Sequence, residues 1–453
     1  MKEKETILSR TQKLPALEDS AFLRYFNFIA LYFTEGLPQG MLFIGIPAWL
    51  AAEGKSAAEI GAFAVACSLP WTFKFVVAPL MDRYTYLPMG RKRPWVLISH
   101  IGLILSLIGI SFVPDPLNNL EILYVAAFAL SSCGAIQDAA GDAMAVDVIP
   151  DEQQARANGY MQGSRMLGSS LALVLGSWVL NAYSFQAAMM TICALVTLIT
   201  LVPLVLRERK GEKLLPFTTG EASVVSMNMQ MSNWRMILTA LYKVFRLKDS
   251  ILVVLLLFIT MGAYNFFEHL LPIFTVKITG WSNVDYSQIF ATADIVGGIG
   301  GILAGGWLIE KFGKKRMVNV YFFVIMGMAL LLAFSKPLWE ETQFMNGFIV
   351  TYRLFNAFAK IGVFAIAMQC CSRNISASQF TIYMTTGATG SIAGAALIGP
   401  IKENFSWEIS FLFFVGFMLL AWVVMLFLNI DKQIEKITEL ERKETERQYL
   451  EAS

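Results

Sequence analysis

Charged side chains lie inside long apolar segments of this sequence, where they are costly to bury. The residues of this kind are Glu35, Lys74, Asp138, Asp142, Arg165, Glu268, His269, Asp294, Arg353 and Lys360. A charged group inside a lipid bilayer usually faces a partner or a water-filled cavity, because its burial alone is unfavourable. Burial raises the pKa of a carboxyl group and a nearby cation lowers it, so an acid that alternates between these surroundings can carry a proton.

Four of these residues are expected at one depth. With a helical rise of about 1.5 Å per residue, Lys74, Asp138 and Arg165 lie about 12–14 Å from the same end of their segments, and Glu35 lies slightly deeper. Asp138 and Asp142 share a helix face through their i, i+4 spacing. We expect Lys74 and Arg165 to bind substrate carboxylates or to balance the acids, since the guanidinium group suits bidentate contact.

The carboxyl groups are the candidates for proton coupling, with static ion pairs that fix helix packing as the alternative. Their expected order of importance is Asp138, then Glu35, Asp142 and Glu268. Other polar side chains on the same segments are candidates for substrate binding. These are Gln137, Tyr264, Asn265, Arg353 and Gln379, together with Lys74 and Arg165. We assign no catalytic residue and expect neither a metal nor a cofactor.

The composition requires a lipid environment for the elements that carry these residues. The chain has 453 residues, of which 56% are hydrophobic and 15% charged, whereas soluble domains average about 25% charged residues. A bilayer core needs roughly 20 apolar helical residues per crossing. Twelve such runs are predicted, at 24–50, 57–81, 95–113, 120–146, 156–181, 186–206, 250–276, 285–309, 317–335, 344–371, 376–401 and 407–429. The sequence thus predicts an all-α membrane protein.

These runs divide the chain into five predicted parts. They are an N-terminal segment (1–23), a six-helix bundle (24–206), a central loop with an amphipathic helix (207–249), a second six-helix bundle (250–429) and a charged tail (430–453). The amphipathic helix either lies along the membrane surface or packs on the bundle as a linker. A near-neutral total charge of +2 gives no reason to expect nucleic acid as a partner.

The basic residues predict the orientation of the chain. Of the 36 Lys and Arg residues, 28 lie on the side shared by both termini, outside the runs or, for Arg24 and Arg156, at the first residue of a run. The opposite side has only Lys55, Lys277, Lys336 and Lys402. Because loops rich in Lys and Arg stay in the cytoplasm, both termini are expected to be cytoplasmic.

Two loops at equivalent places in the halves have similar sequences. The second, GGWLIEKFGKKRMV, fits G-x-x-x-[DE]-[RK]-x-G-[RK]-[RK] with Gly306, Glu310, Lys311, Gly313 and Lys314. The first, APLMDRYTYLPMGRKRPW, has Asp82, Arg83, Gly90 and Arg91, with Ala78 in place of the first glycine and extra residues in the turn. We expect the acids and bases of both loops to latch helix ends as gates, without touching substrate.

The paired loops resemble the signature of the major facilitator superfamily. Further segments resemble the muropeptide permease (AmpG) family and its acetyl-CoA transporter relatives: YFTEGLPQGM (32–41), FKFVVAPLMDRYT (73–85), GRKRPW (90–95), QDAAGDAMAVDVIPDEQ (137–153) and SASQFTIYMTTGATGS (376–391). The stretch 252–281 departs from the expected pattern. The resemblance implies a major facilitator fold with two six-helix pseudo-repeats, each made of inverted repeats.

The resemblance also implies a function. It is proton-driven import of N-acetylglucosaminyl-anhydro-N-acetylmuramyl sugars and peptides through the bacterial inner membrane, by alternating access and as a monomer. A carrier for another bulky anion, such as an acyl-coenzyme A or a peptide, is the alternative. A membrane-embedded enzyme is disfavoured because the sequence has only two His residues and neither H-E-x-x-H nor a G-x-S-x-G elbow. The expected partners are an amphiphilic or anionic small molecule, protons and the lipid bilayer.

Overall fold

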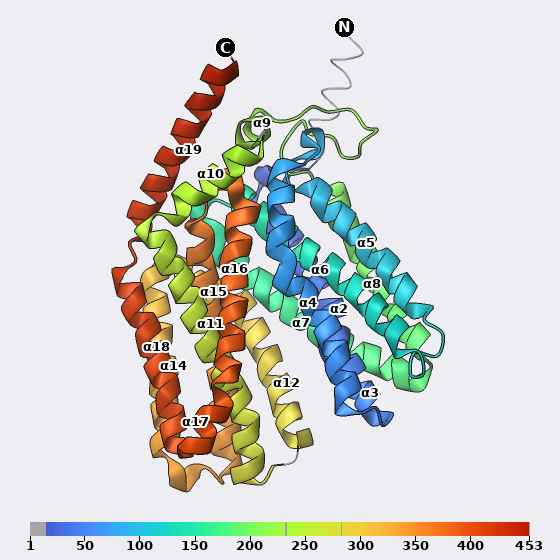
Figure 1. Ribbon diagram of the computed structural model, residues 1–453, viewed down its shortest axis with the longest axis vertical. Coiled ribbons are helices and arrows are strands. Elements are labelled where there is room, and N and C mark those ends of the chain that lie inside the picture. Colours follow the sequence, from blue (N-terminus) through green and yellow to red (C-terminus); the bar gives the residue numbers. More distant parts are fainter. Residues whose placement is uncertain (1–14, 232, 282, 453) are drawn as a thin grey trace. The chain divides into compact units, whose positions relative to one another are not determined.

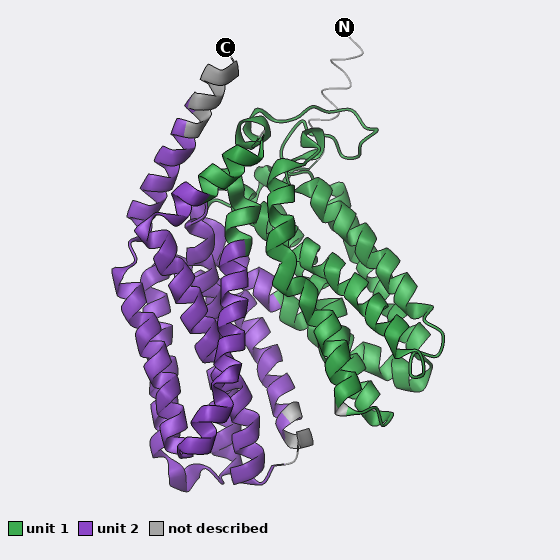
Figure 2. Cartoon of the chain, in the orientation of Figure 1, with its two compact units in different colours: residues 1–150, 164–241, 373–381 green, residues 151–163, 242–372, 382–453 purple. Residues whose placement is uncertain are grey.

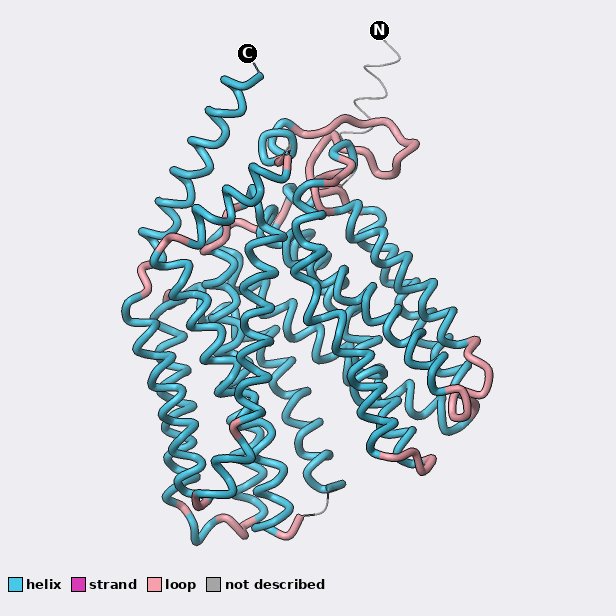
Figure 3. The backbone as a smooth tube through the Cα atoms, viewed as in Figure 1, coloured by secondary structure: helices cyan, strands magenta, loops and turns pink. Residues whose placement is uncertain are grey.

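The computed structural model describes residues 15–231, 233–281 and 283–452. Within these ranges the chain folds into helices joined by loops, without a β-strand (Figures 1 and 3). Part of the predicted N-terminal segment 1–23 lies outside the described residues. The chain forms two compact units (Figure 2): unit 1 comprises residues 1–150, 164–241 and 373–381, and unit 2 the remainder.

Unit 1 is built mainly from the first half of the chain. Its helices are α2 (Ala21–Gly40), the π-helical turn η2 (Met41–Gly45), α3 (Ile46–Ala52), α4 (Ala57–Arg83), α5 (Arg93–Ser111), α6 (Leu120–Val148), most of α7 (Gln154–Ala182), α8 (Phe185–Val205), α9 (Val224–Met229) and most of α10 (Trp234–Phe245). Helix α6 packs between α4 and α5, and α5 packs on α8.

Unit 2 is built mainly from the second half. Its helices are α11 (Lys248–Phe274), η5 (Thr275–Thr279), α12 (Asn283–Gly300), η6 (Gly301–Gly305), α13 (Gly306–Phe312), α14 (Lys314–Phe334), α15 (Thr342–Gln369), most of α16 (Ser376–Ala396), α17 (Ile398–Asn404), α18 (Trp407–Phe427) and α19 (Ile430–Ala452). Here α15 packs between α12 and α14, and α14 packs on α18. The order of packing in unit 1 therefore recurs in unit 2.

Serine side chains cap the beginnings of several long helices. Ser56 accepts a hydrogen bond from the N–H of Glu59 at the start of α4, and the Glu59 carboxylate reciprocates. Ser184 and Ser406 accept in the same way at the starts of α8 and α18. These side chains satisfy N–H groups that lack a partner within the helix, so local sequence sets where the apolar helices begin.

Ten helical segments of the described chain are long and apolar enough to cross a membrane. Two predicted crossings are outside this set: 156–181 lies in α7, and 376–401 lies in α16 and α17. Both α7 and α16 have the length of a crossing, 29 and 21 residues, but their sequences are rich in Gly, Ser, Thr and Gln. The prediction of all-helical architecture is confirmed, whereas that of twelve crossings stays a prediction.

Glycines let α2 and α7 pack with their backbones in contact. A Cβ atom at Gly36 would overlap the carbonyl oxygen of Arg165, and one at Gly40 would overlap that of Ser169. In unit 2 the same relation joins α11 and α16, where Gly394 faces the carbonyl oxygen of Gly262. These contacts fix the separation of the helices and, in unit 1, the position of Arg165.

We expect Gly40→Ala to destabilise the folded protein by about 1–3 kcal/mol, the usual cost of overpacking. The matched control is Gly61→Ala on α4, where nothing lies within 4 Å of the added Cβ atom. That control should gain about 0.5–1 kcal/mol from helix propensity alone. Thermal unfolding of the two variants in detergent measures the difference, and equal stabilities would show that the α2–α7 contact can relax.

Each unit contains a short segment from the other half of the sequence. Residues 373–381, at the start of α16, belong to unit 1, and residues 151–163, at the start of α7, belong to unit 2. These segments are where the two predicted gating loops make their contacts, as described below.

Candidate functional site

Four charged side chains from four helices form one network inside unit 1. The Asp138 carboxylate on α6 accepts a hydrogen bond from Lys74 on α4 and another, of 3.0 Å, from Arg165 on α7. The Arg165 Nε atom also lies 3.3 Å from the Glu35 carboxylate on α2. Side chains of Lys74, Asp138 and Glu35 are less than 10% exposed. The structure thus brings together the four residues predicted to share one depth.

Asp142 lies one turn beyond Asp138 on α6 and has a different partner. Its carboxylate accepts a hydrogen bond from the Tyr32 hydroxyl, and no cation lies within ion-pair distance of it in the described part of the chain. The Arg165 guanidinium stacks over the Tyr32 ring at 4.9 Å. Gln137, the neighbouring candidate, donates to the Leu31 carbonyl at 2.8 Å, so its amide nitrogen joins α6 to α2.

Unit 2 contains a second ion cluster. The Glu268 carboxylate on α11 lies 2.8 Å from Arg353 and 3.1 Å from Lys360, both on α15. Asn356, also on α15, donates to Glu268 at 2.7 Å, and Arg353 pairs in addition with Asp294 on α12. Their i, i+3, i+4 and i+7 spacing places Arg353, Asn356 and Lys360 on one helix face, turned toward the two acids.

Three further residues were predicted to bind substrate: Tyr264, Asn265 and Gln379. The Lys360 ammonium is 5.5 Å from the ring of buried Tyr264, whereas no side-chain partner of Asn265 is found in the described ranges. Gln379 is fully buried in the segment 373–381, which belongs to unit 1, whereas the Arg353 cluster belongs to unit 2. No group of three or more His, Cys, Asp or Glu residues in the described chain is arranged to hold a metal.

The first predicted gating loop surrounds Asp82, the last acid of α4. Its carboxylate accepts from Lys92 and from both the N–H and the hydroxyl of Ser378, at 2.8 and 2.6 Å. Arg91 lies 3.4 Å from Asp82 and 2.9 Å from Asp147 on α6. All five side chains are buried. A carboxylate at a helix N-terminus is favoured by the free N–H groups there, so Asp82 also binds the first turn of α16.

Arg91 extends this contact along the segment that precedes α16. Its guanidinium donates to the carbonyl oxygens of Arg373 and Asn374. Gly90, with φ of 103°, lets the chain turn back so that Arg91 and Lys92 both face Asp82. The extra residues predicted to widen this turn form a short 3-10 helix, Leu87–Met89.

The same turn is held from outside by the central loop. The Glu208 carboxylate accepts from the N–H groups of Arg91, Lys92 and Arg93 at 2.5 to 2.7 Å. A Cβ atom at Gly90 would come within 2.7 Å of this carboxylate. Glu208 therefore occupies the anion site at the N-terminus of α5 and positions the bases that reach Asp82.

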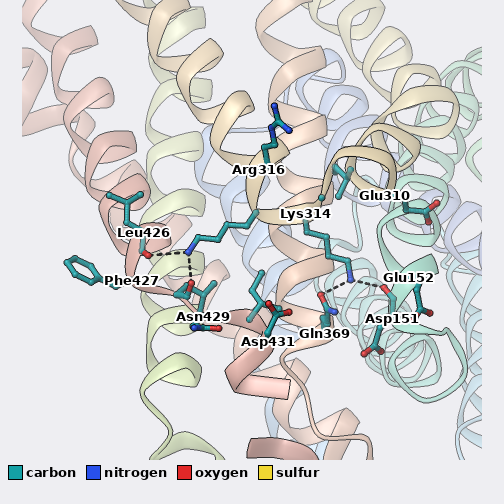
Figure 4. Close-up of a pocket in the computed structure, with 15 residues that line it drawn as sticks. Asp151, Glu152, Glu310, Lys314, Arg316, Gln369, Leu426, Phe427, Asn429 and Asp431 are labelled. Carbon is teal, nitrogen blue, oxygen red and sulfur yellow. Dashed lines mark hydrogen bonds between the residues drawn. The ribbon is translucent and has the colours of Figure 1, made fainter. Parts of the chain in front are cut away.

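The second predicted gating loop makes its contacts within unit 2. Glu310 pairs with Arg156 at 2.6 Å, and Gly306 lies against the Arg156 backbone. Figure 4 shows Lys314 donating to the Asp151 carbonyl and the Gln369 side chain, at 2.7 and 2.8 Å. Asp151, Glu310, Lys314 and Gln369 line a cavity of about 900 Å³. Gly313, with φ of 92°, forms the turn.

The two basic residues that directly follow the loop acids, Arg83 and Lys311, make different contacts from those acids. Arg83 stacks on the neighbouring Tyr84 ring at 5.1 Å, and Lys311 lies over the Trp307 ring at 4.8 Å. Each follows the loop acid directly, and consecutive helical residues point about 100° apart. The acid and the base of each loop therefore point in different directions and have different contacts.

Several residues that contribute to these sites were not predicted as site residues. They include Tyr32, Asp147, Arg156, Glu208, Asn356 and Ser378. Tyr32 lies on a predicted segment one helical turn before Gly36, which is a signal that sequence reasoning can use. Asp147 lies just beyond the predicted run 120–146, and its distance of nine residues from Asp138 does not place the two on one helix face. Glu208 and Ser378 meet the first loop from positions more than 100 residues away. No local pattern indicates such contacts.

A pH dependence is expected from Glu212 in the central loop. Burial, and secondly the nearby Glu208 carboxylate, raise the pKa of Glu212 to about 7. Its carboxylate accepts from the Ser226 hydroxyl and the Arg209 N–H, both at 3.0 Å. Because the folded-state pKa exceeds the ordinary value of 4.5, this group contributes stability below pH 4.5 that is lost as pH rises through 7.

We expect Glu212→Gln to reduce this loss of stability at high pH. For a pKa shift of this size the loss is about 1–3 kcal/mol. Thermal unfolding of wild type and variant at pH 5 and pH 8 is the measurement. The difference between the two pH values should be smaller in the variant, and an identical difference in both proteins would exclude Glu212 as its source.

Comparisons with known proteins agree with this arrangement. The profile of the Major Facilitator Superfamily matches residues 28–395. The chain is 24% identical over 411 residues to the anhydromuropeptide permease of Escherichia coli (strain K12), covering 88% of this chain and 79% of that protein. It is 23% identical over 422 residues to the putative transporter AmpG 4 of Rickettsia felis, covering 90% and 96%.

Solved structures share the fold. A variant of the E. coli fucose:proton symporter FucP matches with a TM-score of 0.67 and 14% identity, over 90% of this chain and 98% of that chain. The human organic anion transporter MFSD10 matches with a TM-score of 0.63 and 12% identity, over 89% and 98%.

These relatives are permeases rather than enzymes, and the apolar helices, repeated packing and match to most of the chain agree with them. The chain belongs to the Major Facilitator Superfamily and is a multi-pass integral membrane transporter of a small-molecule substrate.

Proposed function

We propose that this protein imports anhydromuropeptides across the bacterial inner membrane by proton symport, as a monomer. The observation that carries the proposal is the network of Lys74, Asp138, Arg165 and Glu35, which presents cations and acids together inside apolar helices. Muropeptides carry carboxylates, which such cations can bind. The match to the anhydromuropeptide permease of E. coli over 88% of the chain supports this substrate class.

The proposal includes twelve membrane crossings and cytoplasmic termini. Helices α7 and α16 supply the two more polar crossings, since polar residues of a transporter line its substrate path. The distribution of Lys and Arg, 28 on one side and four on the other, supports the orientation. In this orientation both gating loops face the cytoplasm.

In the proposed cycle, the substrate anion competes with Asp138 for the two cations. Arg165 and Lys74 then exchange a protein carboxylate for a substrate carboxylate, and the released Asp138 takes up a proton. Asp142 has a hydroxyl partner and no ion-pair cation in the described chain, so a second proton is held there or passed on to Asp138. The Glu268, Arg353 and Asp294 cluster supplies the corresponding groups in unit 2.

The two loops act as gates in this cycle. Asp82 and Arg91 hold the start of α16, and Glu310 and Lys314 hold the start of α7. Each gate joins a loop of one sequence half to a helix of the other half. Alternating access requires that these contacts form and break, because rocking of one half against the other is the general mechanism of this fold.

Uptake of radiolabelled anhydromuropeptide into proteoliposomes of the pure protein tests the function. We expect an inward proton gradient to increase the initial rate and a protonophore to remove the increase. Uptake at a rate that does not depend on the proton gradient would contradict proton symport but would still support anhydromuropeptide as the substrate. If demonstrably folded protein takes up no label, the substrate is wrong, and an acyl-coenzyme A or another bulky anion becomes the next candidate.

A further inference from the structure

Helix α10 has one apolar face packed on the protein and a second apolar face exposed. Ile237, Ala240 and Val244 are at most 3% exposed, whereas Trp234, Leu238 and Tyr242 are 40, 62 and 63% exposed. The exposed three follow one another at i, i+4 and i+8, so they form a continuous stripe. A docked helix that faced water on its outer side would present polar residues there. The stripe therefore requires an apolar neighbour.

The charges around the stripe specify that neighbour. Residues 224–248 contain four cations, Arg235, Lys243, Arg246 and Lys248, and no acid. The Arg246 guanidinium lies 5.5 Å from the Tyr242 ring, beside the stripe. A cationic helix with an aromatic and aliphatic face is typical of elements that lie in the interface of an anionic membrane.

Trp234 at the start of α10 and Lys248, three residues beyond its end, each contact the end of a membrane-length helix in their own unit. The Trp234 ring meets the Tyr84 ring edge-on at 6.0 Å, and Tyr84 directly follows α4. The Lys248 ammonium lies 5.8 Å from the ring of Phe427, the last residue of α18, and this ring is 62% exposed. Tyrosine and tryptophan at the ends of spanning helices mark the headgroup region.

We propose that α10 is a binding site for anionic phospholipids. Trp234, Leu238 and Tyr242 insert at the boundary between headgroups and acyl chains, and Arg235, Arg246 and Lys248 bind the lipid phosphates. The site shares no residue with either ion cluster, and its occupancy does not depend on which substrate the protein carries.

Hydrogen exchange of the full chain in nanodiscs tests this site without any substrate. Discs that hold one protein each are made from phosphatidylcholine alone or with about one third phosphatidylglycerol. We expect amides of residues 234–245 to exchange at least threefold more slowly in the anionic discs, with α14 unchanged as an internal reference. Equal exchange of α10 in both lipids would overturn the proposal and leave a protein partner as the occupant of the stripe.

A charge variant provides the second measurement. In R235Q/R246Q/K248Q the protection by phosphatidylglycerol should be lost, because each cation near an anionic surface adds to the attraction. The matched control is K432Q/K436Q/R442Q, which removes three cations from α19 and should keep the protection. Protection that survives in the α10 variant, or is lost equally in both variants, would contradict the assignment. The wild-type lipid comparison tests the proposal independently if the variant does not fold.

Discussion

Asp138→Asn is expected to abolish gradient-driven uptake, with a loss of at least about 100-fold in the initial rate. Asp138 is the only residue of unit 1 in the described chain that contacts both Lys74 and Arg165 through one carboxylate. Removing one partner of a buried ion pair costs about 3–5 kcal/mol, because the remaining charges stay buried without compensation. A free-energy change of this size in one state of the transport cycle corresponds to a change of about 100-fold or more in the population of that state.

The same variant separates a coupling role from a static one. If Asp138 carries the proton, substrate binding to the purified Asp138→Asn protein persists while the response to the proton gradient disappears. If the ion pairs only fix helix packing, thermal stability and binding fall together. The control is Glu121→Gln, which removes an exposed acid from the first turn of the same helix. Full gradient-driven uptake by folded Asp138→Asn protein would exclude Asp138 as the coupling residue.

Asp82→Asn is expected to have the second largest effect. Asparagine still accepts a hydrogen bond from Ser378, but it leaves two fully buried cations with fewer partners. In the described chain Arg91 keeps an ion pair with Asp147, and Lys92 keeps none. We expect a loss of about 3 kcal/mol in stability and a fall of at least about tenfold in uptake, because the start of α16 is no longer held.

The pH dependence of this variant provides a further check. Burial, and secondly the Arg91 charge, lower the pKa of Lys92, while Asp82 raises it. Without Asp82 the pKa of Lys92 falls further. A lysine with a lowered folded-state pKa contributes stability that increases with pH, so part of the lost stability should return between pH 7 and pH 9. Thermal unfolding across this range is the measurement.

Arg83→Gln is the matched control for the loop. Arg83 is adjacent to Asp82 and belongs to the same repeated signature, but it contacts the Tyr84 ring and not the start of α16. We expect the uptake rate of Arg83→Gln to remain within twofold of wild type and its free energy of unfolding to fall by no more than about 1 kcal/mol, because the half-buried Arg83 side chain forms no ion pair in the described chain. Equal losses in both variants would show that the loop matters as a positive patch rather than through the Asp82 contact.

The sequence determined the all-helical architecture, the membrane-length segments and the residue types of both ion clusters. Hydropathy and helical period are local properties, so twenty apolar residues predict a crossing wherever they occur. The depth argument also needed only residue counts along single helices. It correctly grouped Lys74, Asp138, Arg165 and Glu35, because the rise of a helix is independent of its neighbours.

Tertiary structure alone decided which charged groups meet. The rotation of each helix and its distance from the next depend on close packing, as at Gly36 and Gly40, and a shift of one residue turns a side chain by about 100°. For this reason the signature could not separate Asp82 from Arg83. It also could not show that Gln379 belongs to unit 1 although most of α16 belongs to unit 2.

Contacts between distant segments were the least accessible to sequence reasoning. Ser378 reaches Asp82 across 296 positions, and Glu208 reaches the N-terminus of α5 from the central loop. Each partner satisfies N–H groups or charges that the fold has buried, and burial arises only when the helices assemble. Local composition therefore specified which groups need a partner, and the assembled helices decided which partner each group receives.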